Sequence, residues 1–306
     1  MVTQFVVVGD LSLDIVAQSG PRREGSDEPA NIRIGPGGQG ANVAVRLARQ
    51  GAAARLVAAC ADDPAGRLLR EALEADRVTL AGLPTRRSTV VLAMLDDQGE
   101  RTMLSDRQTL DPAAAIGAIE GAGWLHCSGY PLLDDRTGDE LATMLGTRAR
   151  SVRLSVAGGS VPPDPARVSR LRVRLAAARP DLVLLSGDEA GSMLGRPSPL
   201  ALAAAVDLQE LAPVVIVTAG ANGSAAAAGE LRVEIAAHDL PGPMLDATGS
   251  GDAYVAGLLV ELADGAQWPP AEPDLRRAMS TGTRLGALTA RAVGAQARID
   301  GERPPA

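Results

Sequence analysis

Short apolar runs alternate with longer amphipathic stretches along this chain. The runs are continuous rather than alternating in polarity, which is typical of strands in a parallel sheet that is covered on both faces. The expected strands are Phe5–Val8, Leu56–Cys60, Trp124–Cys127, Val152–Val156, Leu182–Leu185 and Val214–Thr218. The expected helices are Val43–Gln50, Pro64–Ala75, Arg136–Arg148, Arg167–Ala178, Asp252–Ala263 and Asp274–Ala292. The pattern therefore predicts an α/β fold.

Two segments depart from this alternation. Ser19–Ala30 is polar and rich in glycine, proline and charge. Further along, Thr89–Leu95 and Arg101–Leu104 are strand-like runs around a short acidic turn that contains a glycine, which is the pattern of a β-hairpin. We expect both segments to be excursions from the main sheet.

The most informative stretch reads Asp-Ala-Thr-Gly-Ser-Gly-Asp-Ala-Tyr from Asp246 to Tyr254 and leads directly into an apolar helix. A glycine-rich turn at a helix start presents backbone N–H groups without intrahelical partners, and the helix dipole favours an anion such as phosphate there. Asp252 would repel that anion, unless it takes a proton from a hydroxyl while the amides hold the transferred phosphoryl group. The alternative is that Asp252 is a first-turn acid favoured by the dipole.

Candidate substrate residues lie near the beginning of the chain. Phe5–Val8 is followed by Asp10 and Asp14, and ligands of open α/β sheets bind outside the carboxyl ends of the strands. The glycine cluster around Gly38 lets a ligand approach the backbone, and Asn42 can donate and accept hydrogen bonds. Arg107 follows the hairpin and is a candidate to grip an anionic or hydroxyl-rich substrate. The alternatives are solvated acids, a tight turn and a surface arginine.

Two signatures make the chain resemble a known family. Asp246–Tyr254 is similar to the pattern D-T-x-G-A-G-D-x-F of the ribokinase-like (PfkB) sugar kinases, and Gly37–Asn42 is similar to their G-G-x-x-x-N. The signatures occur in the expected order, and the resemblance covers nearly the whole chain. It implies one doubly wound α/β domain over residues 1–306, with a mostly parallel sheet flanked by helices. It also implies a small discontinuous β lid from segments at about 14–35 and 87–105, which closes over the sugar.

The resemblance further implies ATP-dependent phosphorylation of a hydroxyl on a sugar or sugar acid, assisted by Mg²⁺. Asp252 would be the general base, beside an anion site made by Gly249, Ser250 and Gly251. Asp10, Asp14, Gly38 and Asn42, with Arg107, would bind the acceptor. The expected nucleotide residues are Ser186, Thr218, Gly220, Gly223 and Thr248, Glu189 would bind Mg²⁺ through water, and Asp246 would belong to a monovalent-cation site.

Three positions depart from the family pattern. Ser186 replaces the asparagine of an N-x-x-E motif, and Ala157 stands near a strand end where relatives usually carry an aspartate. Relatives that bind potassium often place a serine where this chain has Arg298, and an arginine has no lone pair with which to ligate a cation. We therefore expect activity that is nearly independent of K⁺, with Arg298 either reaching Asp246 or pointing into solvent.

Composition narrows the functional classes further. The chain contains no lysine, which excludes a Schiff base and a Walker A lysine. A net charge of −7 without a basic block argues against nucleic acid as a partner. Cys60 and Cys127 form no C-x-x-C pair, so we expect buried thiols in a reducing compartment. Without a signal peptide or a membrane-spanning run, the expected protein is soluble and cytoplasmic.

Other functions stay open at this point. A nucleoside kinase shares the scaffold, although the chain has only five aromatic residues for stacking on a base. A non-catalytic protein that senses a sugar or a nucleotide would explain the departures at Ser186 and Ala157, but it has no use for Asp252. A dinucleotide-binding oxidoreductase is discarded, since it needs G-x-G-x-x-G after the first strand. The resemblance also leaves room for a homodimer through the lid.

Overall fold

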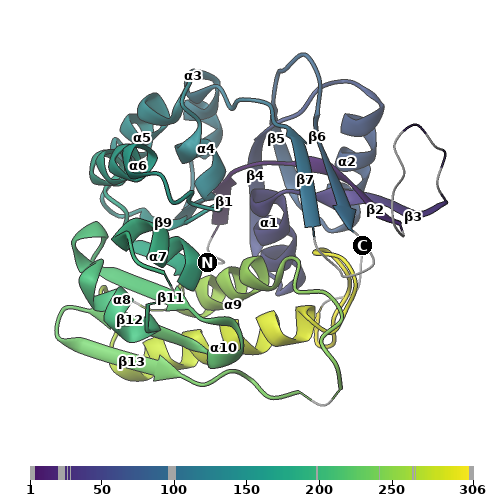
Figure 1. Cartoon of the computed structure of the whole chain (residues 1–306). Coiled ribbons are helices and arrows are strands. Elements are labelled where there is room, and N and C mark those ends of the chain that lie inside the picture. The colour runs from purple at the N-terminus through teal and green to yellow at the C-terminus, as the bar shows by residue number, and fades with distance from the viewer. Residues whose placement is uncertain are drawn as a thin grey trace.

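The computed structural model describes residues 4–302 except 20–24, 26, 28, 96–100, 198, 241, 264 and 266. Its main sheet has the strand order β13-β12-β11-β10-β9-β8-β1-β4-β5, and neighbours from β11 to β5 are parallel (Figure 1). These strands are β1 (Gln4–Val8), β4 (Ala53–Ala59), β5 (Thr79–Leu83), β8 (Trp124–Cys127), β9 (Arg153–Ala157), β10 (Leu182–Ser186) and β11 (Val214–Thr218). An antiparallel hairpin of β12 (Ser224–Ala228) and β13 (Leu231–Ile235) completes this sheet.

Helices cover both faces of the main sheet, so the predicted doubly wound α/β architecture is confirmed. One face carries α1 (Gln39–Arg49), α2 (Pro64–Ala75), α9 (Ser250–Ala263) and α10 (Glu272–Thr289). The other carries α3 (Pro112–Ala115), α4 (Gly129–Leu133), α5 (Gly138–Gly146), α6 (Pro165–Ala178), α7 (Gly187–Leu194) and α8 (Ala201–Asp207). Successive residues of one strand belong to different cores, as Val6 and Val7 do. This explains the continuous apolar runs, because both faces of each strand are buried.

Three helices begin with the same dipeptide. In α2, α3 and α6 an aspartate caps the helix and a proline occupies the first turn. In α2 the Asp63 carboxylate accepts a hydrogen bond from the N–H of Gly66 at 2.7 Å. Proline has no N–H to satisfy in the first turn, and an N-cap of this kind contributes about 1 kcal/mol. These starts are therefore encoded locally.

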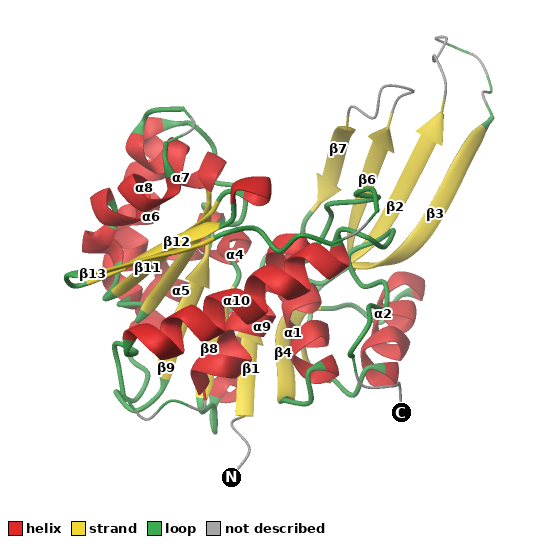
Figure 2. Ribbon diagram, turned by 90° about the horizontal axis from the view of Figure 1, so that it is seen from below, coloured by secondary structure: helices red, strands yellow, loops and turns green. Residues whose placement is uncertain are grey.

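A second, smaller sheet projects from the main body (Figure 2). It has the order β3-β2-β6-β7, formed by β2 (Ser12–Ser19), β3 (Ala30–Gly37), β6 (Thr89–Leu95) and β7 (Arg101–Asp106). The antiparallel pairing of β6 with β7 confirms the predicted hairpin, and its turn lies outside the described residues. The two excursions, distant in sequence, therefore come together in one sheet.

One face of the small sheet is apolar and exposed. Ile34, Ile15, Leu92 and Leu104 follow one another across its four strands. Ile34 is 62% exposed and Leu104 is 56% exposed, which is high for residues of this size. Within the described part of the chain, no helix is long and apolar enough to cross a membrane.

Candidate active site

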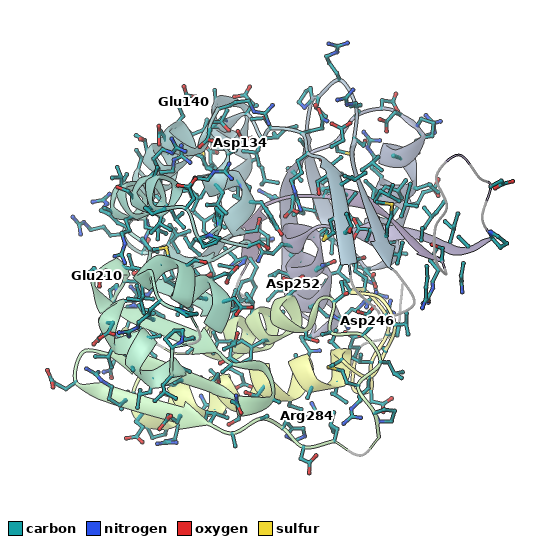
Figure 3. The ribbon with its side chains drawn as sticks, in the orientation of Figure 1. Asp134, Glu140, Glu210, Asp246, Asp252 and Arg284 are labelled. Atoms are coloured by element: carbon teal, nitrogen blue, oxygen red, sulfur yellow. The ribbon has the colours of Figure 1, made fainter. Side chains whose placement is uncertain are left out.

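The proposed anion turn lies at the N-terminal end of α9, in the middle of the molecule, where Figure 3 labels Asp252. Gly249 has a φ of +79°, and a Cβ added there would stand 2.7 Å from the Cα and Cβ of Ala295. Among the described residues, no acceptor takes up the N–H groups of Gly251 and Asp252, because the turn bonds only from Ser250 onto Ala247 and from Ala253 onto Gly249. These two amides are free to bind an anion.

The carboxylate of Asp252 is bound by a residue from the other signature. Its Oδ2 accepts a hydrogen bond of 2.7 Å from Nδ2 of Asn42, on α1. Desolvation raises the pKa of Asp252 to about 7, and the negative charges of Asp10 and Glu189 act in the same direction. The Asn42 hydrogen bond and the charge of Arg46 oppose this rise. A carboxyl group that titrates near neutral pH suits a general base.

Asp10 lies at the carboxyl end of β1 and carries most of the polar contacts on the acceptor side. Its Oδ1 accepts from the N–H of Gly40 at 3.1 Å and from the hydroxyl of Ser128 at 3.3 Å. Its Oδ2 forms an ion pair of 2.7 Å with Arg107. The Arg107 guanidinium lies 3.8 Å from the centre of the Tyr130 ring, a cation–π geometry. The structure thus brings Arg107 to the predicted acceptor site.

The other predicted acceptor residues surround the start of α1. The backbone of this start is tied to β1, since the N–H of Ala41 donates to the Asp10 carbonyl at 3.1 Å. The N–H of Asn42 donates to the Gly38 carbonyl, so Gly38 and Asn42 share one turn. Asp14 stands on β2 and accepts a hydrogen bond of 2.6 Å from Ser12. The small sheet and the main sheet therefore both contribute acids to this site.

Four of the five predicted nucleotide residues lie at or just after the ends of neighbouring strands, and the fifth, Thr248, lies in the anion turn. Ser186 and Thr218 are register partners at the carboxyl ends of β10 and β11. Gly220 and Gly223 follow Thr218 in the turn toward β12. Ser186 is also the N-cap of α7, where its hydroxyl accepts from the N–H of Glu189. Asparagine is an equally good N-cap, so the replacement by serine keeps the cap but removes an amide donor.

Glu189 is held by two backbone N–H groups. Its carboxylate accepts from Ser186 at 2.8 Å and from Ser160 at 2.6 Å. A Cβ on residue 158 would overlap this carboxylate, so the glycine at this position makes room for it. In the described residues no group of three histidines, cysteines or acids could hold a metal ion directly. The binding of Mg²⁺ by Glu189 through water, which the resemblance implies, stays a prediction.

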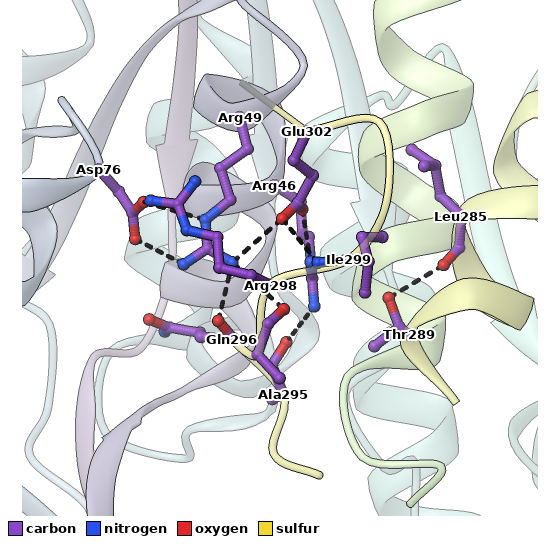
Figure 4. Close-up of polar contacts among 11 residues, drawn as sticks. Arg46, Arg49, Asp76, Leu285, Thr289, Ala295, Gln296, Arg298, Ile299 and Glu302 are labelled. Carbon is purple, nitrogen blue, oxygen red and sulfur yellow. Dashed lines mark hydrogen bonds and ion pairs between the residues drawn. The ribbon is translucent and has the colours of Figure 1, made fainter. Parts of the chain in front are cut away.

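Asp246 connects two loops behind the anion turn. Its carboxylate accepts from the N–H of Thr248 and from the N–H of Gly294, both at 2.9 Å. Figure 3 labels Asp246 beside the loop that leads into α9. The guanidinium of Arg298 forms an ion pair with Asp76, at the end of α2 (Figure 4).

Several site residues have no role in the sequence analysis. Ser128 and Tyr130 follow the predicted strand Trp124–Cys127. Their position after the carboxyl end of a strand could have marked them as site residues. Gln296 donates a hydrogen bond of 3.0 Å to Oδ1 of Asn42, and fully buried Arg46 lies near Asp252. Neither gives a local signal, because a single glutamine or arginine is not distinctive in a polar or amphipathic stretch.

The fold and the site together define a class. The carboxyl group of Asp252 has a pKa of about 7 and lies beside free amides at a helix N-terminus, with the acids Asp10 and Glu189 near it. This arrangement agrees with the predicted ribokinase-like kinase. A family model described as pfkB family carbohydrate kinase matches residues 2–300. The chain belongs to the pfkB family of carbohydrate kinases and is an ATP-dependent sugar kinase.

Individual relatives agree with this assignment. The chain is 30% identical over 306 residues to a fructokinase of Salmonella typhimurium, which covers 93% of this chain and 94% of the relative. A ribokinase structure from Giardia lamblia gives a TM-score of 0.80 at 15% identity, covering 97% of this chain and 95% of that one. A fructokinase double mutant of Vibrio cholerae O395, with fructose, ADP and potassium bound, gives 0.75 at 24%, covering 96% and 94%. Both structures share the fold.

Proposed function

We propose that this chain transfers the γ-phosphoryl group of ATP to a hydroxyl of a neutral sugar, with fructose as the first candidate. The observation that carries the proposal is Asp252, whose carboxylate stands beside two free amides and titrates near pH 7. The acceptor oxygen would attack the γ-phosphorus, the bond to ADP would break, and Asp252 would take the hydroxyl proton. The amides after Gly249 would stabilise the charge on the transferred group.

A neutral acceptor is supported by the charges of the site. Asp10, Glu189 and Asp252 interact electrostatically, and the carboxylate of Asp14 lies beside Gly37, next to the start of α1. Arg107, which could receive a carboxylate, is already paired with Asp10. A sugar acid would have to break this pair and enter a field of negative charge, which is unfavourable when partly desolvated. Sugar hydroxyls can instead donate to these acids.

A nucleoside acceptor is not favoured. Phe5, Trp124 and Trp268 pack against one another in the core, with ring centroids 6.5 and 5.6 Å apart, and Tyr254 is buried. Tyr130 is the remaining aromatic residue, and Arg107 covers one face of its ring. A base would therefore find little surface for stacking. A non-catalytic sensor is likewise not favoured, because the family is one of kinases.

The nucleotide would bind along the ends of β10 and β11. Ser186, Thr218, Gly220, Gly223 and Thr248 would contact it, and its phosphates would meet the α9 amides. Mg²⁺ would neutralise phosphate charge, with Glu189 contributing through water. The small sheet would act as a lid that excludes water from the transfer and so limits hydrolysis of ATP.

The acceptor class is tested by ADP release with pentoses, hexoses, keto-sugar acids and nucleosides at equal concentration. We expect the highest kcat/KM with a neutral ketohexose, at least tenfold above any sugar acid, since tenfold corresponds to only about 1.4 kcal/mol. Preference for a nucleoside or a sugar acid would overturn the acceptor assignment. Absence of acceptor-dependent ADP release with the whole panel would overturn the kinase proposal itself.

Turnover should depend little on potassium, although the Vibrio cholerae fructokinase structure holds this ion. The reason is Arg298, a permanent cation where relatives that bind the ion often place a serine. The measurement is turnover at fixed ionic strength with K⁺ exchanged for a bulky organic cation. We expect less than a twofold change. A severalfold loss would show that Asp246 and its loop form a potassium site in this chain as well.

A homodimer through the lid is also proposed. The row formed by Ile34, Ile15, Leu92 and Leu104 is an apolar surface with exposed ends at Ile34 and Leu104, and such surfaces often mark sites of protein–protein contact. A second copy of the chain would cover it. Sedimentation equilibrium should give the mass of a dimer, and Ile34→Glu should convert it to a monomer; a monomeric wild-type protein would contradict this.

A cytoplasmic location is also proposed. It is supported by the two free, buried cysteines and can be tested by cell fractionation.

A further inference from the structure

The C-terminal segment 294–302 lies beside α1 and is bound to it by buried arginines (Figure 4). Arg46 is fully buried; it donates to the Ala295 carbonyl at 2.8 Å and forms an ion pair with Glu302, whose side chain is 1% exposed. Arg49 donates to the Gln296 carbonyl at 2.8 Å and forms a two-pronged ion pair with Asp76 at 2.7 and 2.9 Å. The segment is thus anchored through its backbone on both sides of residue 296.

Burying these charged groups costs free energy. Removing charges from water carries a desolvation penalty that a buried ion pair does not always recover. Here the pairs are supported by additional hydrogen bonds, since Glu302 also accepts from the N–H of Ile299 and Asp76 also binds Arg298. The result is a rigid loop, whose Ala295 packs under Gly249 of the anion turn. The side chain between these anchor points is that of Gln296.

Gln296 determines which way the Asn42 amide faces. Nε2 of Gln296 donates to Oδ1 of Asn42, and Nδ2 of Asn42 donates to Oδ2 of Asp252. An asparagine amide has a donor end and an acceptor end, so it can be turned over with little change in shape. The donor from Gln296 is satisfied only when the Asn42 oxygen faces it, and this leaves the Asn42 N–H for the carboxylate. A turned-over Asn42 would present its oxygen to Asp252, which suits only the protonated acid.

We propose that Gln296 is a positioning residue of the phosphoryl transfer, which acts through Asn42 to keep Asp252 oriented and ready to accept a proton. The inference rests on the proposed role of Asp252 as general base. Arg46, Arg49 and Glu302 are the support that holds the Gln296 backbone in place. The C-terminal segment is therefore part of the active site, although it contacts neither the acceptor residues on β1 nor the small sheet in any described hydrogen bond.

The charges around Asp252 make this hydrogen bond important. Asp10, after the end of β1, and Glu189, in the first turn of α7, both favour its protonated form. Among the described side chains, Asn42 and Arg46, both from α1, favour the ionised form. Arg46 is fixed by Glu302 and the Ala295 carbonyl. The Asn42 amide can be turned over, and the hydrogen bond from Gln296 fixes its orientation.

The test uses Gln296→Met and Gln296→Glu. The methionine removes the donor at nearly constant length, and the carboxylate of the glutamate would attract the Asn42 N–H away from Asp252. Both variants leave the arginine anchors in place, because Arg49 binds the backbone carbonyl of residue 296 and Arg46 that of Ala295. Variants of Arg46 are unsuitable, since they would strand Glu302 as a buried unpaired charge. The matched control is Gln50→Met, because the buried Nε2 of Gln50 has no hydrogen-bond partner among the described residues.

The measurement is kcat/KM for the acceptor and KM for ATP between pH 5.5 and 9. A hydrogen bond to a charged group contributes about 1.5 kcal/mol or more, so we expect the apparent pKa of the acid limb to rise by about 1 in both variants. Activity should fall roughly tenfold below pH 6.5 and recover to within about twofold of wild type at pH 9. The KM for ATP and the behaviour of Gln50→Met should match wild type.

Two results would overturn the proposal. If both Gln296 variants keep the wild-type pH profile of kcat/KM, Gln296 does not orient Asn42. If kcat/KM falls by the same factor at all pH values, the role of Gln296 is structural. Neither result affects the kinase proposal, because both are read from an enzyme with acceptor-dependent activity. Failure of the kinase proposal would instead appear as absence of such activity in wild type.

Discussion

Replacing Asp252 with asparagine should reduce turnover by roughly a hundredfold or more, within the ~10²–10⁴ that a general base contributes. The substitution keeps the size of the side chain and the acceptor for the Asn42 N–H, but it removes the group that takes the proton. ATP should still bind, because the free amides of α9 are unchanged. The measurement is steady-state turnover with the best acceptor, together with ATP binding by calorimetry.

Asp274→Asn is the matched control. Asp274 is likewise a first-turn acid, on α10, and among the described residues it forms its ion pair with Arg277 at the exposed surface. If Asp252 serves only as a first-turn acid that interacts favourably with the helix dipole, both variants should have the same turnover. We expect turnover of Asp274→Asn to equal that of wild type. Asp252→Asn with at least half of wild-type turnover would remove Asp252 from the mechanism.

The stability of Asp252→Asn separates a lost base from a misfolded protein. The pKa of Asp252 is raised in the folded state, so ionising it costs the native structure free energy. This penalty is absent below the unfolded value near 3.9, grows as the pH rises from about 4 to 7, and is complete above 7. At pH 8 the variant should therefore melt at a temperature equal to or higher than that of wild type. Activity and stability are opposed at this position.

Gly249→Ala should reduce turnover by a similar factor, on the order of 10²–10³, which is the usual cost of losing one donor to a developing charge. The reason is geometric, since the φ of +79° disfavours a side chain and the new Cβ would stand 2.7 Å from Ala295. Ala295 cannot move away easily, because Arg46 holds its carbonyl. The turn would have to shift instead, and with it the amides of Gly251 and Asp252. Turnover and thermal melting measure the two consequences.

Gly229→Ala controls for backbone strain alone. Gly229 has a φ of +56°, and a Cβ added there would meet no atom within 4 Å. It lies in the turn between β12 and β13, at the opposite end of the sheet from Ser186 and Thr218. The strain of about 1–2 kcal/mol should lower the melting temperature by a few degrees and leave turnover unchanged. If Gly249→Ala also kept turnover within threefold of wild type, the anion turn would be wrongly assigned.

Much of the architecture could be read from local patterns. The continuous apolar runs predict buried parallel strands, and Trp124–Cys127 and Val214–Thr218 match β8 and β11 to the residue. The capping aspartate and first-turn proline define the start of α2. The start of α9 could be read from the sequence, because a glycine-rich turn is followed directly by an apolar run. All these signals act between neighbours along the chain.

The hairpin of β12 and β13 has no such signal. Ser224–Ala228 contains four consecutive alanines, which favour a helix when considered alone. It becomes a strand because β11 and β13 pair with it on both sides and all five residues are buried. Tertiary pairing overrides propensity here, since a buried backbone must satisfy its hydrogen bonds.

For the site, the sequence by itself located the proposed anion turn and the proposed base, because both lie within one stretch of nine residues from Asp246 to Tyr254. It also pointed to Asp10 through its position after a strand, and the resemblance to the family motif N-x-x-E pointed to Glu189. Only the tertiary structure decided that Arg107 neutralises Asp10 and that Gln296 reaches Asp252 through Asn42. These contacts join residues 97, 254 and 210 positions apart. Such contacts depend on how distant segments pack together, so the local pattern of polar and apolar residues cannot predict them.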